Sequence, residues 1–314
     1  ALPWSEALLD RYADRWYWGR LSENEALPWS EALIDRYADR WDWGRLSYNE
    51  ALPWSRDLLD RYADRWDWGR LSYNEALPWS RDLLDRYADR WNWGERGLSY
   101  NEALPWSEAL IDRYADRWDW QELSQNEKLP WSENFIDRYA DRWEWDQWGL
   151  SYNEALPWSR DLIDRYADRW DWRRLSKKEV LPWSKALIDR YADRWNWGEW
   201  GLSKNEALPW SEALLDRYAD RWNWKGLSWN EALPWSESLI DRYADRWGWG
   251  GPGFSGNEAL PWSEALIDRY ADRWDWRRLS ANAAVYRSLS EHITPEVIHR
   301  VFGGEESASV LEGF

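Results

Sequence analysis

Two aspartates one helical turn apart recur along this chain, and they are the first residues whose types and spacing could do chemistry. Asp10 and Asp14 form the first pair, and ten further copies follow at the same spacing. Paired carboxylates can bind a metal ion or share a proton. Arg11 and Arg15 alternate with them, however, and a calcium loop needs ligands on alternate residues around a central glycine. We therefore predict a ladder of ion pairs, facing solvent or joining neighbouring repeats, and expect neither a metal site nor a cofactor.

Residues for nucleophilic catalysis are scarce. The chain has no cysteine, and its two histidines, His292 and His299, both lie near the C-terminus. The recurring serines stand where helix caps are expected, so no Ser-His pairing is indicated. No glycine-rich phosphate loop is present; the glycine-rich stretch from Gly248 follows one repeat and precedes the next. The sequence predicts a protein that is not an enzyme.

Aromatic residues offer a second kind of chemistry, which is recognition. Most of the 36 tryptophans recur at identical places and are expected in the core. The residue after each Leu-Ser pair varies instead, and a large aromatic side chain at that place is hard to bury. We predict an exposed contact surface there, with partial packing along the ridge as the alternative. It comprises Tyr48, Tyr73, Tyr100, Tyr152 and Trp229, together with Trp148 and Trp200 from longer loops.

These residues are carried by a tandem repeat. The segment Leu-Pro-Trp-Ser begins eleven repeats, at residues 2, 27, 52, 77, 104, 129, 156, 181, 208, 233 and 260. The steps are 25 or 27 residues, and the two extra residues fall in repeats 4, 6, 8 and 10. Such periods are typical of solenoids, in which each repeat buries its apolar face against its neighbours.

Each repeat is predicted to contain two helices. Ser5 is a suitable N-cap, and an apolar stripe at helical spacing follows it as far as Trp16. A second, shorter helix is predicted from Ser47, because Ser47 and Glu50 have the spacing of a capping box and Pro53 ends the segment. Asn49 is expected to fix the neighbouring backbone, as asparagine does in turns.

The predicted fold class is all-α: tandem 25/27-residue helical repeats that form an α-solenoid over residues 1–283. Residues 284–304 keep a degraded pattern, with Thr294 at the N-cap place and Pro295 after it. They are predicted to form a C-terminal capping repeat. Residues 305–314 are predicted to be a flexible tail.

The inserted residues alternate strictly from repeat 4 onward. Duplication of a two-repeat block explains this pattern, and so does a two-sided array in which neighbouring repeats are related by a rotation near 180°. We favour the two-sided arrangement, which would place the inserted loops with Arg96, Trp148, Trp200 and Pro252 along one side.

Composition limits the partners. The net charge is −17, which disfavours binding to nucleic acid or to an anionic membrane surface. No apolar run approaches the roughly 20 residues that a membrane helix needs. The chain has no methionine, shows no signal peptide and opens at Ala1 in the last part of a repeat, so we expect a fragment or a mature segment.

The stretch WDWGRLSYNEALPW resembles the tandem repeats built on W-D-W-x-x-L-S-x-N of giant DNA viruses and some bacteria. The matching residues are Trp41, Asp42, Trp43, Leu46, Ser47, Asn49 and Trp54, with their equivalents in the other copies. The resemblance covers residues 1–283 and implies no particular activity. From the residues themselves we predict a non-catalytic scaffold that binds protein or peptide. The alternatives are a structural protein that binds itself to form a fibre or surface layer, and a carbohydrate-binding surface.

Overall fold

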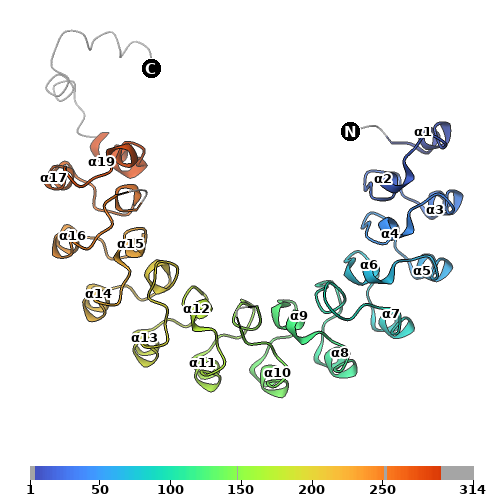
Figure 1. Cartoon of the computed structure of the whole chain (residues 1–314), viewed down its shortest axis with the longest axis horizontal. Coiled ribbons are helices and arrows are strands. Elements are labelled where there is room, and N and C mark those ends of the chain that lie inside the picture. The colour runs from blue at the N-terminus through green and yellow to red at the C-terminus, as the bar shows by residue number, and fades with distance from the viewer. Residues whose placement is uncertain (1–3, 147, 251–252, 291–314) are drawn as a thin grey trace, which may run out of the picture. The chain divides into compact units, whose positions relative to one another are not determined.

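The protein folds into two compact units of tandem helical repeats. The computed structural model describes residues 4–146, 148–250 and 253–290. The first unit comprises Ala1–Pro157 and Asp161–Trp170, and the second comprises Trp158–Arg160 and Asp171–Phe314. Within the described residues every regular element is a helix, and the helices recur with the period of the sequence (Figure 1). The predicted all-α solenoid is confirmed.

The first helix of every repeat has six residues and begins directly after the serine of Leu-Pro-Trp-Ser. We call these helices the first row. In the first unit they are α1 (Glu6–Arg11), α3 (Glu31–Arg36), α5 (Arg56–Arg61), α7 (Arg81–Arg86), α8 (Glu108–Arg113) and α10 (Glu133–Arg138). In the second unit they are α13 (Lys185–Arg190), α14 (Glu212–Arg217), α16 (Glu237–Arg242) and α17 (Glu264–Arg269), and α11 (Arg160–Arg165) includes residues of both units.

The second helix of a repeat begins at the second tryptophan of Trp-x-Trp. We call these helices the second row: α2 (Trp18–Ser22), α4 (Trp43–Leu46), α6 (Trp68–Tyr73), α9 (Trp120–Gln125), α12 (Trp172–Leu175), α15 (Trp224–Leu227) and α18 (Trp276–Leu279). Repeats with the two-residue insertion have turns here, with the 3-10 helices η1 (Leu202–Lys204) and η2 (Phe254–Gly256) in repeats 8 and 10. Helix α19 (Ala283–Ser290) follows the last repeat.

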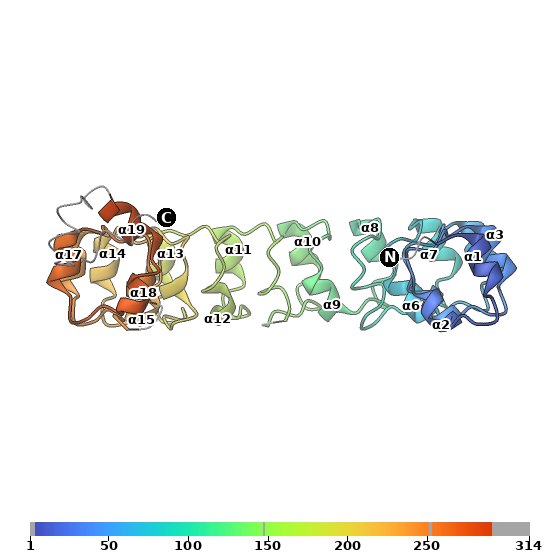
Figure 2. The same cartoon turned by 90° about the horizontal axis from the view of Figure 1, so that it is seen from above.

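The two rows lie apart in each unit. In the first unit, α1, α3, α5, α7, α8 and α10 follow one side, and α2, α4, α6 and α9 follow the other (Figure 1). Seen from above, α7, α8 and α10 lie along one edge of that unit, with α6 and α9 along the opposite edge (Figure 2). Residues of both rows, such as Leu33, Ile34 and Leu46, are fully buried.

The predicted serine cap is confirmed. The Ser30 hydroxyl accepts a hydrogen bond from the backbone N–H of Leu33 at 3.1 Å, and most first-row helices repeat this bond. It satisfies a backbone donor that has no partner within the helix.

The first-row helix is shorter than predicted, because it ends at Arg36 rather than running to Trp41. The Trp41 indole Nε1 donates to the carbonyl of Ile34 at 3.2 Å. In a continuing α-helix, this carbonyl would accept a hydrogen bond from the N–H of Ala38 instead. That N–H instead reaches the Asp35 carbonyl, at 3.4 Å. A side chain has therefore taken the place of a helical hydrogen bond and turned the chain.

The predicted start of the second helix is wrong. Helix α4 begins at Trp43, and its N-cap is Asp42, whose carboxylate accepts from the N–H of Arg45 at 3.1 Å. The Ser47 hydroxyl is not available as a cap, because it donates to the Trp43 carbonyl at 2.7 Å and accepts from the Asp67 N–H of the next repeat at 2.9 Å. The serine of the apparent capping box thus joins two repeats.

Tryptophan rings pack each repeat against the next. Trp43 contacts Trp66 and Tyr62 of the following repeat, with ring centroids 4.8 and 4.5 Å apart, and is only 9% exposed. Trp276 occupies the same place in repeat 11, where no framework tyrosine follows, and is 53% exposed. The next repeat therefore provides the burial, as expected for an array whose single repeats are not stable alone.

The aspartate pairs form the predicted ion-pair ladder between repeats. Arg36 bridges to Asp10 at 3.2 Å, and Arg40 bridges to Asp14 at 2.6 Å. Arg40 also donates to the Ala13 carbonyl at 2.9 Å and lies over the Trp18 ring, 5.8 Å from its centroid. Arg40 is therefore fixed by a carboxylate, a carbonyl and an aromatic face, which is more than a simple surface ion pair provides.

A buried asparagine makes the third kind of contact between repeats. Asn74 Oδ1 accepts from the N–H of Ala76 at 2.9 Å, so the predicted turn is confirmed. Its Nδ2 donates to the Ser47 carbonyl of the preceding repeat at 3.1 Å. Because a buried carbonyl without a partner is costly, this bond fixes the register between neighbouring repeats.

The two-sided arrangement is wrong. Each framework tryptophan pair between consecutive repeats has the same spacing, 4.6 to 4.9 Å between ring centroids, with or without inserted residues. In each unit the first-row helices of consecutive repeats also follow one side (Figure 1), so consecutive repeats face the same way. The inserted loops lie in the second row, and a repeat without an insertion separates each from the next.

The described residues include only part of the segment predicted to form the C-terminal capping repeat and the tail. Helix α19 includes the first residues of the predicted capping repeat. The rest of the predicted cap, with Thr294 and Pro295, and the predicted tail at 305–314 lie outside the described residues.

We predict that the protein loses stability at alkaline pH, because the tyrosines at the junctions between repeats have raised pKa values. Burial first, and then the hydrogen bond to an aspartate of the preceding repeat, raise the pKa to about 12 in Tyr62, Tyr166, Tyr243 and Tyr270. In the unfolded chain these tyrosines have the ordinary pKa of about 10. The stability that the raised pKa contributes is therefore fully present below pH 10, and it is lost as the pH rises through about 12. We expect the free energy of unfolding to fall across this window.

The measurement is urea unfolding followed by circular dichroism at several pH values, with tyrosinate absorbance near 295 nm followed in parallel. A titration in denaturant is the control, because its tyrosines should ionise near pH 10. Framework tyrosines that ionise at the same pH in folded and denatured protein would contradict the expectation.

Candidate functional site

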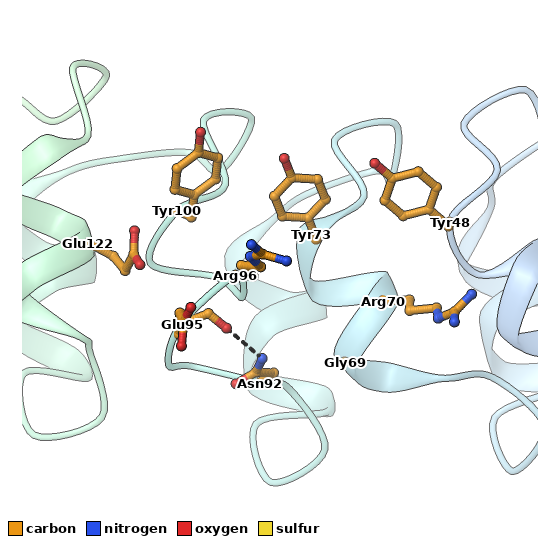
Figure 3. A pocket seen from close by; sticks show the side chains of 9 residues that line it. All are labelled: Tyr48, Gly69, Arg70, Tyr73, Asn92, Glu95, Arg96, Tyr100 and Glu122. Atoms are coloured by element: carbon orange, nitrogen blue, oxygen red, sulfur yellow. Dashed lines mark hydrogen bonds between the residues drawn. The ribbon is translucent and has the colours of Figure 1, made fainter.

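Three of the aromatic residues predicted to be exposed are brought together in the first unit. Tyr48, Tyr73 and Tyr100 come from repeats 2, 3 and 4 and stand in line along the second row (Figure 3). The rings of Tyr48 and Tyr73 are stacked at 6.0 Å and 8°, and those of Tyr73 and Tyr100 at 5.6 Å and 17°. Tyr48 is 57% and Tyr100 46% exposed, and Tyr73 between them is half-buried. We call these three residues the tyrosine ladder.

The framework sets the spacing of the ladder. Each tyrosine stands between the serine and the asparagine that bind neighbouring repeats. The Ser72 carbonyl, directly before Tyr73, accepts from Asn101 Nδ2 at 3.0 Å. The Ser72 hydroxyl accepts from the Asn92 N–H at 2.9 Å. The backbone that carries each ring is therefore fixed before any ligand arrives, which lowers the entropic cost of binding.

The ring edges of the ladder are available, and the faces between the rings are not. Stacking covers both faces of Tyr73 and one face each of Tyr48 and Tyr100. Across the part of the chain that the structure describes, none of the three hydroxyls has a hydrogen-bond partner. Burial, followed by the nearby Tyr100, Tyr48 and Glu75, raises the pKa of Tyr73. The Tyr73 phenol is therefore neutral at physiological pH, and each of the three hydroxyl groups can donate or accept a hydrogen bond.

A groove of about 780 Å³ lies beside the ladder. It is lined by the three tyrosines and by Gly69, Arg70, Asn92, Glu95, Arg96 and Glu122 (Figure 3). The inserted loop of repeat 4 forms part of its wall. In this loop Asn92 Nδ2 donates to the Glu95 carbonyl at 3.2 Å, and the Leu98 N–H donates to the Asn92 carbonyl at 2.8 Å.

Arg96 has a strained backbone. Its φ of 51° is the only positive value among the described residues other than glycine. A non-glycine residue in this region costs about 1–3 kcal/mol and is commonly found at functional sites. The tight inserted loop holds the Arg96 side chain within the groove.

The charged groups of the groove differ in their partners. Arg70 is paired with Asp67 at 3.3 Å and donates to the Gly44 carbonyl at 3.1 Å. By contrast, the side chains of Glu95, Arg96 and Glu122 form neither an ion pair nor a hydrogen bond within the described residues. Burial, with the nearby Asp119 and Glu95 carboxylates, raises the pKa of Glu122, and Arg96 opposes this effect.

The other predicted site residues form separate clusters. Trp148 and Tyr152 lie together in repeat 6 of the first unit, with ring centroids 6.5 Å apart, and both are exposed. Repeat 5 has Gln125 at the variable position, so the aromatic row is interrupted between Tyr100 and Tyr152.

In the second unit, a lysine lies between two of the predicted tryptophans. Lys204 Nζ is 4.3 Å from the ring centroid of Trp200 and 5.4 Å from that of Trp229. Trp200 is 62% exposed and Trp229 is half-buried. A small groove of about 170 Å³ beside them is lined by Lys177, Glu179, Trp200, Gly201, Lys204 and Asn205. One face of each tryptophan is thus covered by a cation of the same chain.

The sequence analysis did not identify the charged residues of these clusters, although three signals were present. Lys204 occupies the same variable position as Tyr48. Arg96 occupies the same place in its inserted loop as Trp148 and Trp200. Glu122 stands where Arg45 and Arg70 stand in repeats 2 and 3, so the sign of the charge is reversed there.

The geometry suits recognition by hydrogen bonds, apolar contact and charge. No group of three or more His, Asp or Glu side chains that could hold a metal ion occurs among residues 4–146, 148–250 and 253–290. His292 and His299 lie outside these ranges.

Comparisons with known proteins give no relative from which a function could be transferred. The chain matches no protein-family model, no curated protein and no solved structure. The resemblance to W-D-W-x-x-L-S-x-N repeats therefore stays a prediction. Within the described part of the chain, none of the helices has the length and apolar character needed to cross a membrane.

Proposed function

We propose that this protein is a non-catalytic repeat scaffold that binds a protein or peptide segment along the tyrosine ladder. The observation that carries the proposal is the ladder itself: three phenol rings at a fixed spacing, with exposed edges, beside a groove. Tyrosine edges of this kind provide apolar contact and hydrogen bonding at low entropic cost.

The spacing of the ladder suits an extended chain. An extended peptide rises about 3.2–3.4 Å per residue, so groups of the same orientation recur about every 6.5 Å. The ring centroids of the ladder are 6.0 and 5.6 Å apart. The three hydroxyl groups can therefore bond to the backbone at three alternate residues of a segment that crosses the three repeats, one hydroxyl to each residue.

The ladder gives less support to carbohydrate binding. Sugars stack on open aromatic faces, but the inner faces here are covered by neighbouring rings. In the second unit, Lys204 covers one face of Trp200 and of Trp229. Ring edges with hydroxyl groups suit an amide backbone better than they suit a sugar ring.

The test is selection of peptides from a random linear library on the immobilised 314-residue chain, followed by affinity measurement by fluorescence polarisation. We expect the variant Y48A/Y73A/Y100A to bind the selected peptides at least tenfold more weakly than the unmodified chain. The control is Tyr17→Ala, since Tyr17 is exposed but lies outside the ladder; its affinity should be unchanged.

Two results would overturn the proposal: no peptide is enriched, or the ladder variant binds as well as the unmodified chain. Circular dichroism checks that the variant is folded. Light scattering over a dilution series tests the self-assembling alternative, because a scaffold that binds other proteins should keep a constant mass.

A further inference from the structure

The charges around the tyrosine ladder are unevenly distributed, and this distribution defines the ligand more closely. Glu122 lies beyond Tyr100 at one end of the groove, and Arg70 lies below Tyr48 at the other (Figure 3). Arg96 lies beneath the rings of Tyr73 and Tyr100, with Glu95 nearby (Figure 3). The two ends of the groove therefore present charges of opposite sign.

The carboxylates are in excess among the unpaired groups. The charge of Arg70 is already compensated by Asp67. Of the described side chains that line the groove, Glu95, Glu122 and Arg96 are the charged ones without an ion pair. Two carboxylates face one guanidinium, and Asp119 adds a further negative charge near Glu122. One additional cation would balance this end of the groove.

We infer that the groove binds an extended peptide segment with a single basic side chain, which lies at the Tyr100 end between Glu95 and Glu122. This inference rests on the proposed function. A lysine or arginine there replaces the water that the half-buried Glu122 carboxylate loses on binding. The net charge of −17 favours the approach of such a ligand at long range. A basic residue at the Tyr48 end would instead meet Arg70.

The inference thus distinguishes one basic residue at a fixed position from general attraction to basic peptides. A polybasic segment gains from the net charge of the chain but places cations beside Arg70 and Arg96. The expected motif has a lysine or arginine at one end, and neutral residues over Tyr73 and Tyr48, at the two-residue period of the ladder.

The experiment is the same library selection, read out by position and repeated with E95Q/E122Q. We expect lysine or arginine to be enriched at one position on the unmodified chain, and this enrichment to disappear on the variant. For one selected peptide, replacing the basic residue by alanine should weaken binding to the unmodified chain about tenfold. The same replacement should change binding to E95Q/E122Q less than twofold.

Glu25→Gln is the matched control, because Glu25 is exposed and lies outside the groove. This variant removes one negative charge and should keep both the enrichment and the affinity. The binding measurements are made at low and at physiological salt, since general attraction fades with salt more steeply than a contact at a fixed position.

The outcomes separate this inference from the proposed function. Peptides that need the ladder but show no basic position, or a basic position unaffected by E95Q/E122Q, overturn the inference and leave the scaffold proposal standing. Equal enrichment of basic residues at all positions also overturns it. If no peptide depends on the ladder, both fail.

Discussion

Trp118→Ala is expected to lower the free energy of unfolding by about 3–5 kcal/mol, which is the range for removing a large aromatic side chain from a core. Trp118 is 4% exposed, and its Nε1 donates to the Ile111 carbonyl at 3.2 Å. Its ring packs against Trp93 of the preceding repeat at 4.8 Å and against Trp106 at 5.1 Å. The substitution removes contacts within the repeat and between repeats, and it leaves a buried carbonyl without its donor.

Tyr100→Ala is the matched control, because it removes an exposed aromatic side chain from the repeat before Trp118. It should cost less than about 1 kcal/mol, as most surface substitutions do. Urea unfolding followed by far-ultraviolet circular dichroism measures both variants, since 35 tryptophans remain in the first variant and would obscure a fluorescence change. Similar losses in the two variants would show that the framework and variable positions have been confused.

Features of the fold that depend on local signals were predicted correctly. The serine before each first-row helix caps that helix because its hydroxyl reaches a backbone N–H three residues later, whatever the rest of the chain does. The exact repetition of tryptophan indicated that burial is shared between repeats, and the exposure of Trp276 agrees with this.

Features that depend on competition between partners were not predictable. Ser47 and Glu50 have the spacing of a capping box, but the Ser47 hydroxyl bonds to Trp43 and to Asp67 of the next repeat. Nothing near Ser47 in the sequence indicates that a neighbouring repeat will take its hydroxyl. In the same way, the indole of Trp41 ends a helix by occupying a carbonyl, which the apolar stripe does not reveal.

The alternation of loop lengths was misinterpreted for a geometric reason. In repeat 2 the Leu46 N–H closes on the Asp42 carbonyl at 2.9 Å, and in repeat 4 the Leu98 N–H closes on the Asn92 carbonyl at 2.8 Å. The two extra residues bulge out between groups that keep the same bond. Because the ends of the loop do not move, an insertion says nothing about how neighbouring repeats are oriented.

The candidate site was predicted in part. Variation at one position of a constant repeat indicated exposed aromatic side chains, and three of them form the ladder. The groove required the structure, because Glu95 and Arg96 come from the inserted loop of repeat 4, whereas Glu122 comes from α9 in repeat 5. The reversed charge at Glu122 is the signal that a comparison of repeats would have revealed.

The inserted loop leads to the second large expected effect. Gly97→Ala should lower the free energy of unfolding by about 3 kcal/mol, within the range for overpacking a tight site together with the loss of a hydrogen bond. A Cβ atom at Gly97 would lie 2.2 Å from the carbonyl oxygen of Asn92. That oxygen accepts the Leu98 N–H at 2.8 Å, so the backbone cannot move aside without breaking the bond that closes the loop.

Gly94→Ala in the same loop is the matched control. A Cβ atom at Gly94 would lie 3.7 Å from its nearest neighbour, Asn92 Oδ1, which is an ordinary van der Waals contact. Its effect should stay within about 0.5 kcal/mol. Gly149 and Gly201 stand at the place of Gly97 in repeats 6 and 8, where a Cβ would lie 2.0 Å from the carbonyls of Glu144 and Asn196. Both should respond to alanine as Gly97 does. Urea unfolding of the four variants decides: equal effects of Gly94→Ala and Gly97→Ala would mean that the inserted loop is not closed on the Asn92 carbonyl. The groove beside the tyrosine ladder would then lack the fixed wall that holds Glu95 and Arg96.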